Sequence, residues 1–191
     1  MMLAAPGVSA QGTVTLYGGT RSGGEFVDAN SNTAIKLASS AAFSASVDWF
    51  LDDGRQAQLF TSFQRSSLPG SVAQRSGDIP VNVAYVHLGG RVFFDGPGVT
   101  RGPYLVGGLG ITHLSPSLNG LTAEVRPSAN LGIGFEWPLA PQIALRGEMR
   151  GYLTLVNSSG GFFCSGGCVV AIRGDTISQF EGMLGLAFAF R

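Results

Sequence analysis

Apolar and polar residues alternate with a period of two along most of the chain. Between residues 143 and 155 the odd positions are apolar or glycine, whereas the even positions include Arg146, Glu148 and Arg150. Such alternation places successive side chains on opposite faces of a β-strand. Almost no window shows the spacing of apolar residues that is typical of a helix. The pattern therefore predicts an all-β protein whose strands have one apolar and one polar face.

Eight segments show this alternation, and most have the roughly 9–11 residues that a tilted strand needs to cross a bilayer. Short turns join the second segment to the third, the fourth to the fifth and the sixth to the seventh, whereas the other connections are longer and polar. Short turns on one rim and long loops on the other are typical of a transmembrane β-barrel. The segments cover about residues 12–21, 41–51, 56–66, 80–94, 102–114, 126–138, 142–156 and 176–190.

The glycines on the polar faces indicate which face points inward. Eight strands enclose an interior with room only for side chains, so long side chains fit there only beside nearly empty positions such as Gly132 and Gly134. A water-facing surface has no need of such glycines, which weaken a strand. The apolar faces carry no charge except Arg65 near a loop end, as contact with lipid requires. The predicted lumen ion-pair network comprises Asp48, Arg91, Glu136, Arg146, Glu148, Arg150 and Glu181.

Large aromatic residues stand at the ends of the even-numbered segments, on the apolar face. In an up-and-down barrel these ends meet at one rim, where aromatic rings favour the boundary between lipid and water. The last segment also alternates large apolar residues with glycine or alanine, and we expect it to pair with the first segment and close the barrel. The predicted aromatic girdle comprises Trp49, Phe94, Trp137 and Phe190.

Composition narrows the function classes further. Twelve basic residues balance twelve acidic ones, so the chain lacks the charge excess typical of nucleic-acid binding. A transmembrane helix needs roughly 20 consecutive apolar residues, and the sequence has no such run. Residues 1–10 are interpreted as a residual signal-peptide-like segment, because Val8, Ser9 and Ala10 have the small-x-small pattern of a cleavage site. A flexible N-terminal tail is the alternative, and residues 11–191 form the predicted barrel domain.

Two cysteines, Cys164 and Cys168, lie in the connection between the seventh and eighth segments. A closely spaced pair in an exported protein predicts a small disulfide loop. A zinc site is the weaker interpretation, because a second pair of ligands is missing, and two unpaired thiols are expected if the chain is cytosolic. Phe162 and Phe163 precede this pair, and exposed aromatic side chains on a stiffened loop favour contact with a partner or surface.

The chain resembles the small eight-stranded outer-membrane barrels of Gram-negative bacteria, the OmpA/OmpX/OmpW-like barrel domains. The resemblance covers about residues 11–191 and rests on strand rhythm, loop asymmetry and the terminal strand LAFAF. In that family a C-terminal Phe is read by the barrel-assembly machinery; here Arg191 follows Phe190. The resemblance implies a closed antiparallel up-and-down barrel in the outer membrane, with periplasmic short turns and extracellular long loops. It also implies a narrow interior, contact with outer-membrane lipid, and roles in membrane integrity, adhesion or small-solute passage.

Candidate catalytic residues are few. His87 could be combined with Asp48, Ser44 or Ser46 as a hydrolytic triad, and His113 lies near the loop rim beside Ser115. The glycine-rich stretches 107–110 and 132–134 do not stand between a strand and a helix, as a phosphate-binding loop requires. We therefore predict a non-enzymatic barrel without cofactor or metal, and with surface ligands at its loops.

Several alternatives remain at this stage. The charged ladder of the seventh segment, with Glu136 beside it, acts either as a static plug or as a gate that rearranges to admit ions; the narrow bore of eight strands favours the plug. The alternative functions are a lipid-modifying barrel enzyme, a narrow pore and a soluble ligand-binding barrel.

Overall fold

The computed structural model describes residues 12–28, 34–52, 54–68, 78–94, 101–117, 122–156, 172–173 and 176–190. The signal-like segment 1–10 and the cysteine pair lie outside these residues. No helix long and apolar enough to cross a membrane occurs in the described ranges.

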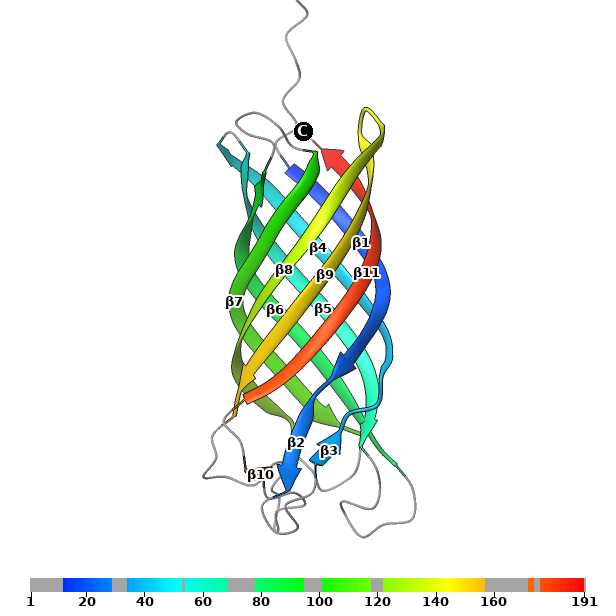
Figure 1. The fold of residues 1–191 in the computed structure, drawn as a ribbon, viewed down its shortest axis with the longest axis vertical. Coiled ribbons are helices and arrows are strands. Elements are labelled where there is room, and N and C mark those ends of the chain that lie inside the picture. The colour runs from blue at the N-terminus through cyan, green and yellow to red at the C-terminus, as the bar shows by residue number, and fades with distance from the viewer. Residues whose placement is uncertain are drawn as a thin grey trace, which may run out of the picture.

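Eight antiparallel strands close into a barrel in the order β1-β11-β9-β8-β7-β6-β5-β4, which is the order of an up-and-down barrel (Figure 1). Each coincides with a predicted segment to within a few residues, so the predicted fold class is confirmed. The barrel strands are β1 (Gly12–Gly23), β4 (Ser40–Asp52), β5 (Arg55–Leu68), β6 (Ile79–Phe93), β7 (Gly102–Pro116), β8 (Glu124–Ala140), β9 (Ile143–Leu155) and β11 (Thr176–Phe190).

Closure brings the two ends of the described chain together. β1 pairs with β11 from Gly12 opposite Phe190 to Gly23 opposite Gln179, and Gly12 also pairs with Trp49 of β4. Both terminal strands therefore have backbone partners on both sides, which leaves neither as an open edge. The C-terminus lies at the short-turn rim, opposite the rim that carries the loops (Figure 1).

Three further strands lie at the loop rim, in segments that the sequence pattern assigns to loops. They are β2 (Glu25–Asp28), β3 (Ala34–Lys36) and β10 (Ile172–Arg173), and they form a separate sheet in the order β10-β2-β3. Strands of two to four residues are too short to show a measurable alternation, so the sequence pattern could not predict them.

The barrel is turned inside out compared with a soluble protein. Leu131 and Leu184 are each 63% exposed on the outer wall, whereas Arg146 is 0% and Glu181 2% exposed in the lumen. Burial alternates along the barrel strands, as the period of two requires, except at the short-turn end of β8, where residues 137–140 are all exposed. The predicted orientation of the two faces is thus confirmed: apolar side chains point outward and the charged ones inward.

This orientation reverses close to the loops. In β6 the lumen-facing Ile79, Val81 and Val83 are apolar and buried, while Asn82 faces outward; farther from the loops Leu88 faces outward. The outer face of β6 is therefore polar at this end, as is that of β5, where Arg65 is exposed. On β8 and β9, by contrast, Val125 and Leu155 stay exposed and apolar near the loops. A buried apolar layer thus lies inside the barrel near the loops, although the sequence pattern predicts polar residues there. It comprises Leu37, Leu68, Ile79, Val81, Val83, Leu114, Val156 and Ile177.

Candidate functional site

The lumen contains three clusters of paired charges that follow one another along β9 and β1, from the short turns towards the loops. The first joins two arginines to two carboxylates. Arg146 donates through Nε to Glu136 Oε2 and through Nη1 to Asp48 Oδ2, both at 2.6 Å. Arg91 donates to Glu136 at 3.2 Å and lies 3.6 Å from Asp48. Among these side chains only that of Glu136 is exposed, at 13%.

The second cluster is built around the ion pair between Arg150 and Glu148. Arg150 Nη2 donates to Gln58 Oε1 at 2.7 Å, and its Nη1 donates to Asn130 Oδ1 at 3.1 Å. The hydroxyl of Tyr104 donates to Glu148 Oε2 at 2.8 Å. The pair is buried, and the neighbouring polar groups replace part of the hydration that both charges lose.

The third cluster contains an arginine that the sequence analysis missed. Arg21 donates to Glu181 Oε2 through Nε at 3.0 Å and Nη2 at 2.8 Å. Ser44 and Tyr152 also donate to this carboxylate, at 2.7 and 2.8 Å. Arg21 is the last residue of the predicted first segment, where that segment borders a long polar connection, and it was not included in the predicted network. With it, four arginines face four carboxylates, instead of the three arginines expected from the sequence.

Aromatic rings stack on the buried guanidinium groups. Arg21 Cζ lies 4.8 Å from the ring centroid of Tyr85 and 5.0 Å from that of Tyr152. Arg150 Cζ lies 3.7 Å from the ring centroid of Phe60. Cation–π contacts are strongest where both groups are shielded from water, so these rings stabilise charges that would otherwise be poorly solvated.

Lumen glycines make room for these large side chains. A Cβ atom on Gly134 would overlap the ring of Tyr104, and one on Gly185 would overlap the ring of Tyr17. A Cβ on Gly132 would lie 2.8 Å from Cγ of Arg150. The glycines are thus required where a long side chain crosses directly over a neighbouring strand, which is the use that the sequence analysis expected of them.

The histidines are not arranged as the triad considered from the sequence. His87 is buried and its Nε2 lies 2.9 Å from Ser128 Oγ on β8. Asp48 is bound instead by arginine and by Gln58, which donates to it at 2.6 Å. His113 is exposed on the outer face of β7. No cluster of three or more His, Cys, Asp or Glu side chains suited to a metal ion is found in the described part of the chain.

The aromatic residues of the expected girdle all lie on the outer wall at or near strand ends. Trp49 and Phe190 are each 40% exposed, and Gly12 pairs with both across the β4–β1–β11 wall. Trp137 is 48% and Phe94 60% exposed. Rings at this position would contact the boundary between hydrocarbon and water.

An outward apolar belt around a lumen of paired charges defines the class of protein: a transmembrane β-barrel of the bacterial outer-membrane type. No family model matches the chain, and no curated protein matches its sequence. Several solved structures are similar in fold, among them the following two. Neisserial surface protein A aligns with a TM-score of 0.64 at 12% identity, over 95% of this chain and 98% of its own. The outer-membrane protein AlkL aligns with a TM-score of 0.52 at 15% identity, over 100% and 97% of the two chains.

At such identities the likeness establishes the fold. The chain has the fold of the small bacterial outer-membrane barrels, as its sequence resemblance implied, and that expectation is confirmed.

Proposed function

We propose that this protein is a non-enzymatic outer-membrane barrel with a structural, surface-interaction or membrane-integrity role, whose lumen is plugged. The observation that carries this proposal is the filling of the lumen. Four arginines and four carboxylates are paired in three successive clusters, and a buried apolar layer follows them towards the loops.

Energetics favour a static plug over a gate. Separating a buried ion pair leaves uncompensated charges, and breaking such a pair typically costs about 3–5 kcal/mol. A gate would have to break the contacts of Arg146 with both Asp48 and Glu136. It would also have to open the apolar layer, which holds no groups to stabilise a passing ion.

Planar-bilayer recording tests the plug. The purified protein, inserted and shown to be folded by heat-modifiable gel mobility, is expected to give no steady conductance. A porin inserted into the same bilayer serves as the positive control. Steady conductance from the folded protein would overturn the plug in favour of the narrow pore.

The absence of catalysis is tested separately. We expect no hydrolysis of phospholipid or lipid A, and no difference between the protein and His113→Ala. Hydrolysis that disappears in His113→Ala would instead support a lipid-modifying enzyme, because His113 is the exposed histidine of the described strands.

The loops supply the interaction part of the proposal. The long connections all leave the same rim, where β2, β3 and β10 form their own sheet (Figure 1). We propose a surface ligand there, a disulfide between Cys164 and Cys168, and contact with the barrel-assembly machinery during insertion. Deletion of residues 160–170 is expected to weaken binding to cells or matrix components; unchanged binding would remove this loop from the proposal.

A further inference from the structure

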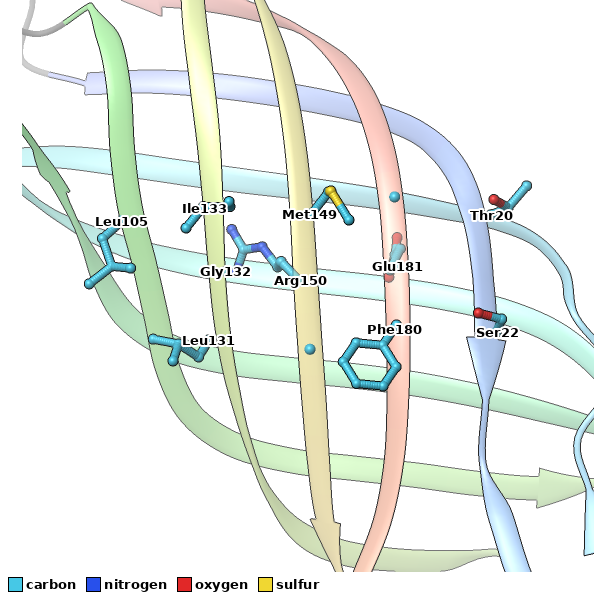
Figure 2. Close-up of a pocket in the computed structure, with 12 residues that line it drawn as sticks. Thr20, Ser22, Leu105, Leu131, Gly132, Ile133, Met149, Arg150, Phe180 and Glu181 are labelled. Atoms are coloured by element: carbon cyan, nitrogen blue, oxygen red, sulfur yellow. The ribbon is translucent and has the colours of Figure 1, made fainter.

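The outer wall has a long apolar groove that the lumen clusters do not explain. Two hollows of about 480 and 740 Å³ adjoin each other across β1, β11, β9 and β8. Both are bordered by Thr20, Ile133, Met149 and Gly182, so they form one continuous groove. Figure 2 shows the hollow nearer the loops, with Met149 and Ile133 beside it.

Outward-facing glycines form the floor of this groove. A Cβ atom added to Gly18 or Gly182 would meet no atom within 4 Å, and one added to Gly147 would make ordinary contact at 3.5 Å with Leu184. Neither a left-handed backbone nor a crossing side chain requires glycine at these three positions. Glycine weakens a strand interior. At these three positions the absence of a side chain changes only the shape of the outer surface, where it leaves the groove open.

The two ends of the groove differ in polarity. Thr20 and Ser22 of β1 are exposed at the loop side and supply hydroxyl groups. The opposite end is bordered by the rings of Trp137 and Phe94. The exposed side chains between them, such as Ile133 and Met149, are apolar. Arg150, Glu181 and Glu148 also border the hollows, but their side chains are buried in the lumen. A molecule with a polar head at the loop side and an apolar tail directed towards the short turns would match this arrangement.

We propose that the groove binds an acyl chain of an outer-leaflet lipid, with the polar head of the lipid at Thr20 and Ser22. The groove is continuous with the apolar belt, which faces hydrocarbon, and an unfilled hollow would forfeit dispersion contacts along its lining. A hydrocarbon chain is thin enough to reach the glycine floor. A second copy of the barrel is convex, so it would rest on the flanking side chains and leave the floor empty. The inference goes beyond a structural role and does not depend on a plugged lumen.

The two tryptophans of the chain allow a direct test. Trp137 borders the groove, whereas Trp49 has a similar exposure but lies on β4, away from it. Trp49→Phe and Trp137→Phe each leave a single reporter. Phosphatidylethanolamine with brominated acyl chains is titrated into each folded protein in detergent. We expect the fluorescence of Trp137 to be quenched in a saturable way. The fluorescence of Trp49 should decrease only in proportion to the lipid fraction of the micelle. Equal, non-saturable quenching of both reporters would overturn the proposal.

Filling the groove gives an independent control. In the Trp49→Phe background, Gly18→Leu together with Gly182→Leu should abolish the saturable component. Ala84→Leu adds a similar side chain to the outer face of β6, outside the groove, and should leave it unchanged. If the paired variant does not fold, Gly182→Ala serves instead and should weaken the saturable component. Saturable quenching that survives in the folded filled variant would contradict the proposal, as would a stable dimer in which Trp137 is protected from the lipid.

Discussion

Glycine has two distinct uses at the scale of single residues. Gly185 faces the lumen, where a Cβ would overlap Tyr17 and approach the backbone oxygen of Leu16 to 2.7 Å. Gly182, three residues earlier in the same strand, faces outward with free space around it. The same residue type therefore admits a large lumen side chain at one position and shapes the outer wall at the other.

This difference predicts opposite responses to alanine. Gly185→Ala overpacks the lumen and should destabilise the barrel by about 1–3 kcal/mol. Gly182→Ala should leave the free energy of unfolding unchanged or slightly higher, because alanine restricts the unfolded chain more than glycine does. Urea unfolding in lipid vesicles measures both variants. Equal stabilities would show that Tyr17 does not occupy the space above Gly185.

The buried ion pairs predict a second contrast between residues. Glu181→Gln removes the charge that Arg21 pairs with at 2.8 Å, in a site where neither side chain is exposed. We expect a loss of about 3–5 kcal/mol, since an uncompensated charge stays buried. Glu124 also pairs with Arg126, at 2.7 Å, but both side chains are partly exposed. Glu124→Gln should therefore cost less than about 1 kcal/mol, and equal losses would contradict the burial argument.

The residues that sequence reasoning found and missed differ in their position along the strands. Glu148 and Arg150 lie in the middle of a long alternating segment, so the neighbouring residues predict on which face of the strand they lie. Arg21 lies at a segment end, where a shift of one residue decides between strand and loop. The partners of these charges, such as Gln58 and Ser44, come from other strands; which residues meet across the lumen depends on barrel tilt and side-chain length, not on local pattern.

At the scale of elements, the apolar residues of β6 change the direction in which they face along the strand. Its apolar residues face inward near the loops, at Val81 and Val83, and outward farther down, at Val86 and Leu88. One strand therefore contains two alternations of opposite phase. We expect the reversal in β6 to mark the level at which lipid outside this strand gives way to water, because its outer face becomes polar there while its apolar side chains turn inward.

Cysteine labelling tests this boundary. In a Cys164→Ser, Cys168→Ser background reconstituted in vesicles, Asn82→Cys should react with a water-soluble maleimide. Leu88→Cys should not react, although Leu88 is 66% exposed, because lipid covers it. Val83→Cys, which faces the lumen, should also stay unreactive. Rapid labelling of Leu88→Cys would mean that water surrounds this part of the wall, and would favour a soluble barrel.

The reversal also explains how far the sequence could predict the elements. Alternation with apolar residues outward predicts the middle of each barrel strand correctly. At the loop end of β5 the apolar residue faces inward instead, so the predicted third segment ends at 66 and misses Leu68. The short strands β2, β3 and β10 depend on pairing between segments far apart in the chain: Ile172 pairs with Asp28. Such pairing leaves no local pattern in either segment.

For the whole molecule, the proposed plug would distribute closure of the lumen over several layers. The cluster of Asp48, Arg91, Glu136 and Arg146 occupies the end near the short turns, and the Arg21–Glu181 cluster and the apolar layer lie towards the loops. A passage through the barrel would require every layer to open together. If a single cluster acted as the gate, the other layers would have to be permeable at all times.

The two arrangements predict different results when a single layer is removed. Asp48→Ser combined with Arg146→Ser deletes one charge of each sign, which avoids leaving a net unpaired charge in the first cluster. We expect this variant to be less stable but still silent in planar-bilayer recordings, because the remaining layers still close the lumen. Heat-modifiable mobility of the same sample shows that it is folded. Steady conductance from the folded double variant, with none from the unmodified protein, would assign closure to the first cluster alone and identify it as a gate.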